Sequence, residues 1–167
     1  QVLAASIVHP DKKTVIPLAP EPIINQDGTN KNDCERNASK RLLVKFRREH
    51  PHLPVIVVAD GLSSNAPYIR LLKDLKMHFL LVAKPSEHQY LFQEVTKAID
   101  ENRYTIISWH PEDQPDVLCE VGFAHDLPLN QANPDVRVNF LCYTEYGPEG
   151  QRLQITWVTD LELTTDN

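Results

Sequence analysis

The stretch that most constrains the fold runs from Val55 to Leu62 and reads VIVVADGL. Four consecutive aliphatic residues followed by an alanine predict a short strand buried on both faces, as in the middle of a parallel or mixed sheet. Asp60 follows this strand directly, and Gly61 lets the backbone turn away. Sheet proteins place ligand-binding acids at such carboxyl ends, but turn caps use the same residue types. Asp60 is therefore interpreted either as a ligand or as the cap of the following turn.

Turn residues and apolar periodicity predict a mixed α/β architecture around this strand. Hairpin, helix, strand, helix and strand follow one another, so right-handed crossovers would make the last two strands parallel. Lys84 ends the second of these strands, as Asp60 ends the first, and it either holds a phosphate or is a solvated strand end. The predicted elements are a hairpin over residues 1–8 and 14–18, helices over 34–49, near 67–77 and over 87–102, and strands over 55–59 and 79–83.

The first predicted helix, residues 34–49, is amphipathic. Ala38, Leu42 and Phe46 recur every four residues and form an apolar stripe, and Asp33 is the expected N-cap. The opposite face is basic, although the whole chain has a net charge of −6. Such a face is usually solvated, and the alternative is contact with a polyanion. Its basic residues are Arg36, Lys40, Arg41, Lys45, Arg47 and Arg48.

Composition narrows the class of protein. At 167 residues, with 41% hydrophobic and 24% charged residues, the chain fits a globular protein with one substantial core. No apolar run reaches the roughly 20 residues that cross a bilayer, so no membrane partner is expected, and no secretory leader is recognised. Three widely spaced cysteines without a CxxC pair favour a reducing, cytoplasmic setting. Because the chain begins without methionine, we expect a piece of a longer protein.

The pattern changes after Arg103. Strand-like runs now alternate with turns rich in Pro, Asn, Asp and Gly, which predicts a β-rich subdomain inserted into or appended to the α/β part. The expected domains are therefore residues 1–102, the α/β part, and residues 103–167, the β-rich subdomain. The strand-like runs cover residues 104–109, 117–123, 136–146 and 153–158.

Four stretches carry a resemblance to a known family: HPDKKTVIPLAPEPI, KNDCERNASKRLL, VIVVADGLSSNAPYI and FLLVAKP. Together they resemble the middle of the catalytic domain of insertion-sequence transposases of the DDE type. The resemblance covers about residues 1–100, whereas residues 101–167 match more loosely a β-rich insertion that some members carry. TWVTDLEL is similar to the strand by which such members return to the core. The resemblance implies that residues 1–102 are a partial catalytic core, an incomplete ribonuclease-H-like mixed sheet with crossover helices, and that residues 103–167 are a β-rich insertion subdomain.

The family's chemistry is DNA cleavage and joining, in which three carboxylates hold two Mg²⁺ or Mn²⁺ ions. Asp60 matches the second acid, whereas the first would precede Gln1 and the third would follow Asn167. The resemblance thus implies that Asp60 is a catalytic residue and metal ligand in a DNA-transposing parent. It also implies that the chain alone is inactive and binds no metal ion tightly. Lys84, Arg36, Lys40 and Arg47 are the expected nucleic-acid contacts.

The resemblance also has a consequence for the sheet. The family's first strand would lie between the strand of residues 1–8 and that of residues 55–59, and without it two sheet edges stay unpaired. Unpaired edges recruit partners, so we expect either direct pairing of these two strands or self-association with another copy of the chain.

Two other functions remain open. The first is a non-catalytic remnant that binds protein or DNA. The second is an unrelated α/β phosphatase or nucleotide-binding domain, against which stands the lack of a Gly-rich phosphate loop and of a DxD motif after a strand.

Overall fold

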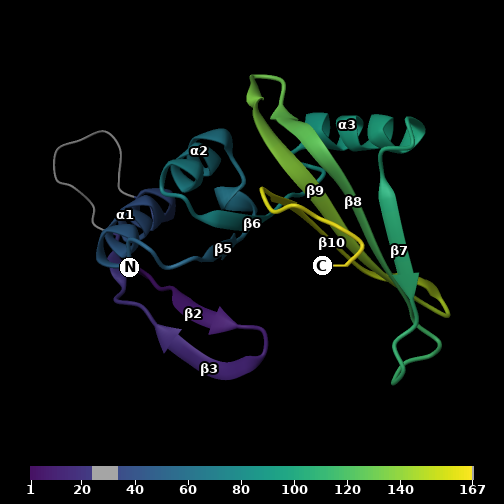
Figure 1. Ribbon diagram of the computed structural model, residues 1–167, viewed down its shortest axis with the longest axis horizontal. Helices are drawn as coiled ribbons and strands as arrows, with labels where there is room; N and C mark the ends of the chain where they lie inside the picture. Colours follow the sequence, from purple (N-terminus) through teal and green to yellow (C-terminus); the bar gives the residue numbers. More distant parts are fainter. Residues whose placement is uncertain (24–33, 167) are drawn as a thin grey trace. The chain divides into compact units, whose positions relative to one another are not determined.

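A computed structural model describes residues 1–23 and 34–166 of the chain. The chain forms two compact units, Gln1–Leu53 and Pro54–Asn167 (Figure 1). The predicted domains, 1–102 and 103–167, follow a change in sequence pattern instead, and that division stays a prediction. None of the helices in the described part of the chain has the length and apolar character needed to cross a bilayer.

The first unit contains two small sheets and one helix. β2 (Ser6–His9) pairs antiparallel with β3 (Lys12–Pro17), which confirms the predicted hairpin. β1 (Val2–Leu3) pairs antiparallel with β4 (Glu21–Pro22). The helix α1 (Glu35–Glu49) contacts both β1 and β4.

The buried side of α1 follows the predicted apolar stripe. Ala38, Leu42 and Phe46 are all buried, because residues four apart lie on the same face of a helix. The N-cap position belongs to Cys34, whose side chain makes no capping hydrogen bond. Asp33, the predicted cap, lies outside the described residues.

The second unit is built on a six-stranded mixed sheet with the order β5-β6-β10-β9-β8-β7. β5 and β6 run parallel, and the other neighbouring pairs are antiparallel. Strands from both sides of residue 102 thus share one hydrogen-bonded layer, and the mixed α/β class is confirmed. The strands are β5 (Ile56–Ala59), β6 (His78–Val82), β7 (Thr105–Trp109), β8 (Leu118–Asn130), β9 (Asn133–Gly147) and β10 (Gly150–Thr159).

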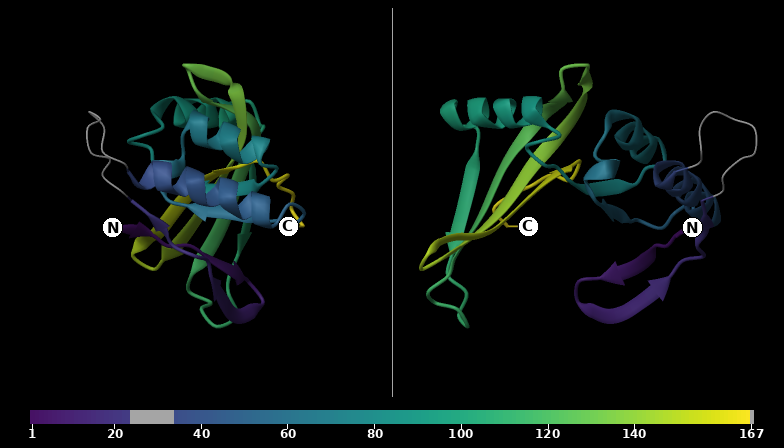
Figure 2. Two further views of the ribbon diagram at one scale, coloured as in Figure 1. Left: turned by 90° about the vertical axis from the view of Figure 1, so that its left-hand side faces the viewer. Right: turned by 180° about the vertical axis from the view of Figure 1, so that it is seen from behind.

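Two helices pack on this sheet. α2 (Ala66–Asp74) connects β5 to β6 and contacts β6, and α3 (Gln89–Asp100) packs across β8 (Figure 2). Asn65 caps α2: its Oδ1 accepts a hydrogen bond from Tyr68 N at 3.1 Å. α2 ends at Asp74 and not near Met77, because Lys76 has a left-handed φ of 52° that cannot continue the helix.

β5 corrects one expectation. The aliphatic run was expected in the middle of the sheet, yet β5 is an edge strand whose Ile56 and Val58 are 51% and 67% exposed. The strand predicted over residues 1–8 was also expected to pair with β5. Among the described residues it does not, because β1 pairs with β4 and β2 with β3. An apolar run signals a strand, but the strands beside it decide whether it is buried.

Candidate functional site

Asp60 lies at the carboxyl end of β5, where the backbone enters the short 3-10 helix η1 (Gly61–Ser63). Its Oδ1 accepts a hydrogen bond from Leu62 N at 3.1 Å, so the turn-cap interpretation is confirmed. The side chain is nevertheless exposed. Capping therefore leaves the carboxylate accessible to solvent, and the ligand role stays a prediction.

Lys84 emerges at the same end of the sheet as Asp60. It follows β6 by two residues, and β6 runs parallel to β5. The Lys84 carbonyl oxygen accepts hydrogen bonds from Glu87 N and His88 N, both at 3.0 Å, and so shapes the turn that leads into α3. Its side chain is exposed. The sequence thus predicted where Lys84 lies, while its contact with a phosphate stays a prediction.

Glu87 brings a second carboxylate to this end of the sheet, and no motif in the sequence marked it. A methyl group placed on Gly61 would lie 3.1 Å from Glu87 Oε2 and 3.7 Å from Val82 O. Glu87 therefore lies against the backbone that directly follows Asp60, and the glycine leaves it the room. The one available signal is the place of Glu87 in the turn after a buried strand.

His88 completes the group that we call the Asp60 corner: Asp60, Lys84, Glu87 and His88. The imidazole is buried, with 9% of the residue exposed. Burial lowers the pKa of His88, because a charged imidazolium is poorly solvated there, and the negative charge of Glu87 opposes this shift. His88 is therefore neutral at pH 7.

The Asp60 corner contains two carboxylates, those of Asp60 and Glu87, that a divalent metal ion could use as ligands. Its carboxylate oxygens are the ligand type that Mg²⁺ and Mn²⁺ prefer. Among residues 1–23 and 34–166, however, no three His, Cys, Asp or Glu side chains gather closely enough to hold a metal ion. The described residues thus do not by themselves fit such an ion, and we derive no catalytic step through one.

Two arginines of α1 have structural partners within the first unit. Arg47 donates from Nη1 to the carbonyl oxygens of His50 at 3.0 Å and Leu53 at 2.9 Å, which ties down the chain after the helix. Arg41 donates from Nε to Glu21 Oε1 at 2.6 Å and so holds α1 to β4. A predicted nucleic-acid contact, Arg47, therefore already holds the chain that leaves α1.

The other predicted contacts on α1 differ in exposure. Arg36 is exposed, and Lys40 is half-buried. Both belong to the first unit, whereas Asp60 and Lys84 belong to the second. The role of Arg36, Lys40 and Arg47 in binding nucleic acid stays a prediction.

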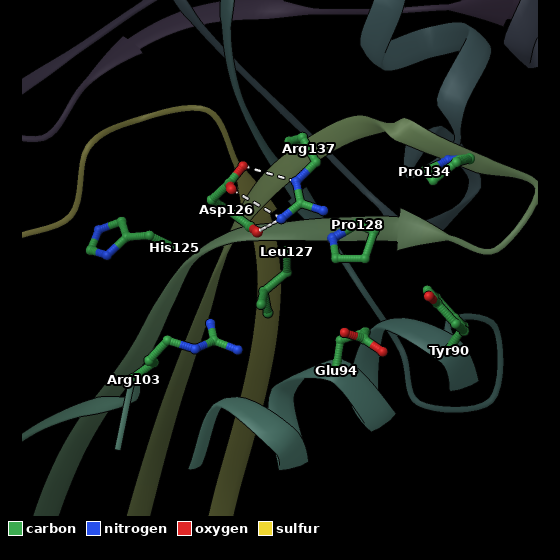
Figure 3. Close-up of a pocket in the computed structure, with 9 residues that line it drawn as sticks. All are labelled: Tyr90, Glu94, Arg103, His125, Asp126, Leu127, Pro128, Pro134 and Arg137. Carbon is green, nitrogen blue, oxygen red and sulfur yellow. Dashed lines mark hydrogen bonds and ion pairs between the residues drawn. The ribbon is translucent and has the colours of Figure 1, made fainter. Parts of the chain in front are cut away.

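A cavity of about 560 Å³ lies between α3 and the hairpin of β8 and β9, and Figure 3 shows the residues that line it. Arg137 donates from Nε and Nη2 to the two carboxylate oxygens of Asp126, at 2.9 and 3.0 Å. These hydrogen bonds lower the pKa of Asp126. The predicted site residues do not line this cavity, which is lined by Tyr90, Glu94, Arg103, His125, Asp126, Leu127, Pro128, Pro134 and Arg137.

A second cavity, of about 610 Å³, adjoins the Asp60 corner. Glu87 and His88 line one side of it, and residues 129–133 at the tip of the β8–β9 hairpin line the other. Two of the four residues of the Asp60 corner, Glu87 and His88, therefore face this cavity.

Comparison with known proteins adds no assignment, because neither a protein-family model nor a curated protein sequence matches the chain.

Proposed function

We propose that the chain is part of the ribonuclease-H-like catalytic domain of a DDE-type insertion-sequence transposase, whose parent cleaves and joins DNA strands by metal-dependent phosphoryl transfer. The observation that carries the proposal is the position of Asp60. It presents an exposed carboxylate at the carboxyl end of a strand that runs parallel to its neighbour, with a crossover helix between them. Acids that bind ligands stand at such ends of parallel strands. Asp60 is one ligand of a metal site that the parent completes.

The path of β10 supports the same proposal. After the β-rich segment the chain returns to pair antiparallel with β6, with Trp157 opposite Val82 and Thr159 opposite Leu80. This return matches what the resemblance implies for TWVTDLEL. Lys84, at the same end of the sheet as Asp60, is placed to hold a DNA phosphate as a point charge.

The experiment replaces Asp60 by Asn in the complete parent protein and measures DNA strand cleavage with Mg²⁺ or Mn²⁺. Asn keeps an oxygen that accepts the hydrogen bond from Leu62 N, so the turn and the fold should persist. We expect cleavage to fall by at least about 100-fold, because the lost metal ligand removes several kcal/mol of charge stabilisation.

Asp100→Asn is the matched control, since Asp100 is an exposed acid at the end of α3. It should cleave DNA as the unmodified protein does. Unchanged cleavage by Asp60→Asn, or an equal loss in both variants, would contradict the role of Asp60.

A further inference from the structure

In the described residues the outer side of β5 is an edge of the sheet. His78 N donates to Val55 O at 3.1 Å, so the odd-numbered residues of this segment direct their N–H and C=O groups towards β6. In an extended strand successive residues alternate, so Ile56 and Val58 direct theirs to the other side. In the described part of the chain no strand pairs with β5 on that side.

Within its four residues β5 lacks the features that keep edge strands from pairing, although Pro54 and Asp60 flank it. Such edges usually carry a charged side chain, a proline or a bulge. The four residues of β5 are Ile, Val, Val and Ala, and their register with β6 is regular. Ile56 and Val58 are 51% and 67% exposed. An incoming strand would therefore find both hydrogen-bonding groups and apolar side chains.

We infer that β5 binds β5 of a second copy of the chain, antiparallel, about a two-fold axis at Val57. This register sets Ile56 opposite Val58 of the partner subunit. Both are outward-facing residues, so each such pair exchanges two backbone hydrogen bonds. Their aliphatic side chains lie on one face of the joined sheet and cover each other.

The charges at the strand ends favour this occupant and this direction. In the antiparallel register Asp60 stands opposite Pro54 of the partner subunit, so no two acids face each other. A parallel pairing would instead set the two Asp60 carboxylates side by side, which like charges disfavour. A strand paired with its own copy thus matches apolar residues with apolar residues and separates the acids.

The contact is small. Each copy contributes only the four residues of β5, which bury less than the roughly 1,200 Å² of a standard stable interface. The dimer should therefore be weak and concentration-dependent. The inference concerns the 167-residue chain itself, because in the parent of the proposed function the family's first strand would lie on this side of β5. Its tests use no catalytic activity, so either idea can fail without the other.

The first test is sedimentation equilibrium of the 167-residue chain from about 5 to about 500 µM, the range in which a small interface should associate. We expect the mass to rise from monomer to dimer. Val58→Lys should weaken association by at least 10-fold, on the order of one buried charge. Because Val58 is exposed, the variant should keep the far-UV circular dichroism of the unmodified chain.

Ile106→Lys is the matched control, since Ile106 is 59% exposed on β7, the opposite edge strand of the same sheet. It should associate as the unmodified chain does. A monomer at every concentration, unchanged association of Val58→Lys, or loss of association in Ile106→Lys instead would overturn the inference.

A second test fixes the register. Across the proposed axis the two Val57 residues form a non-hydrogen-bonded pair with Cα atoms about 4.5 Å apart, within reach of a disulfide. In a Cys34→Ser background, which removes the exposed native thiol, Val57→Cys should form an intermolecular disulfide under mild oxidation. Val55→Cys should not, because Val55 stands opposite Ala59 of the partner subunit. Equal cross-linking of both variants would indicate another register and overturn the inference.

Discussion

β5 and β6 are neighbouring parallel strands with similar aliphatic sequences and opposite surroundings. β6 lies between β5 and β10, and its Phe79 and Leu81 are fully buried. β5 has one neighbour in the described sheet: Val57 and Ala59, on the same face as Phe79 and Leu81, are only half-buried, and Val58 on the other face is 67% exposed. The comparison shows that an apolar run determines that a strand forms, whereas its neighbours determine what the strand contributes. Stability should therefore depend on β6, and interaction with partners on β5.

Side-chain hydrogen bonds to the backbone of β6 strengthen the contrast between β6 and β5. Thr159 at the end of β10 donates from Oγ1 to Phe79 O at 2.6 Å, and Thr156 donates to Ala83 O. Asp160 Oδ1 accepts from Phe79 N at 3.0 Å. β6 is thus held by side-chain hydrogen bonds from β10 in addition to its two backbone ladders.

The largest expected difference between the strands comes from truncating one side chain on each. Phe79→Ala should lower the free energy of unfolding by about 3–5 kcal/mol, because it leaves a cavity in a fully buried position. Val58→Ala should change it by less than about 1 kcal/mol, since most of that side chain is already in water. Urea denaturation at low protein concentration measures both. Similar losses in the two variants would refute the contrast.

The same contrast explains how far the sequence could predict the fold. The stripes of α1 and of α3, where Leu91, Val95 and Ala98 are buried, were predictable because helix burial follows local spacing. The existence of the strands was predictable because it also follows from a local pattern, the apolar run. The edge position of β5 was not, because it depends on β10 returning to β6, with Trp157 opposite Val82, from a distant part of the chain.

The sequence could predict the positions of some residues of the candidate site but not of others. Asp60 and Lys84 could be placed at one end of the sheet because a right-handed crossover makes their strands parallel. Glu87 could not, because its contact with Gly61 depends on the conformation of the turn after β6. Residues 84–88, KPSEH, contain no spacing of residue types that specifies the conformation of that turn.

The next largest effect should come from Asp160, which pairs with β6 and not with β5. Asp160→Ala leaves Phe79 N without its partner and removes the contact between Asp160 Oδ2 and His78 Nδ1 at 3.1 Å. We expect a loss of about 1–3 kcal/mol in the free energy of unfolding, the cost of an unpaired buried donor. Asp160→Asn keeps an acceptor oxygen and should lose less. Equal losses in the two variants, measured by urea denaturation, would show that this hydrogen bond does not hold β6.

The smallest effect is a pH dependence in the turn that follows β6. Burial holds the pKa of His88 in the folded chain below its ordinary value of 6.5, so between these two values the unfolded chain binds more protons. Stability is therefore complete above about pH 6.5 and falls as the pH drops towards the folded pKa, by at most about 1.4 kcal/mol per pH unit for one proton. His88→Gln should flatten this slope between about pH 7.5 and 5.5, whereas His110→Gln, at an exposed histidine, should keep it. If unfolding curves gave His88→Gln the same slope as the unmodified chain, the turn after β6 would be as open to water as β5, and the contrast between the two strands would stop at Val82.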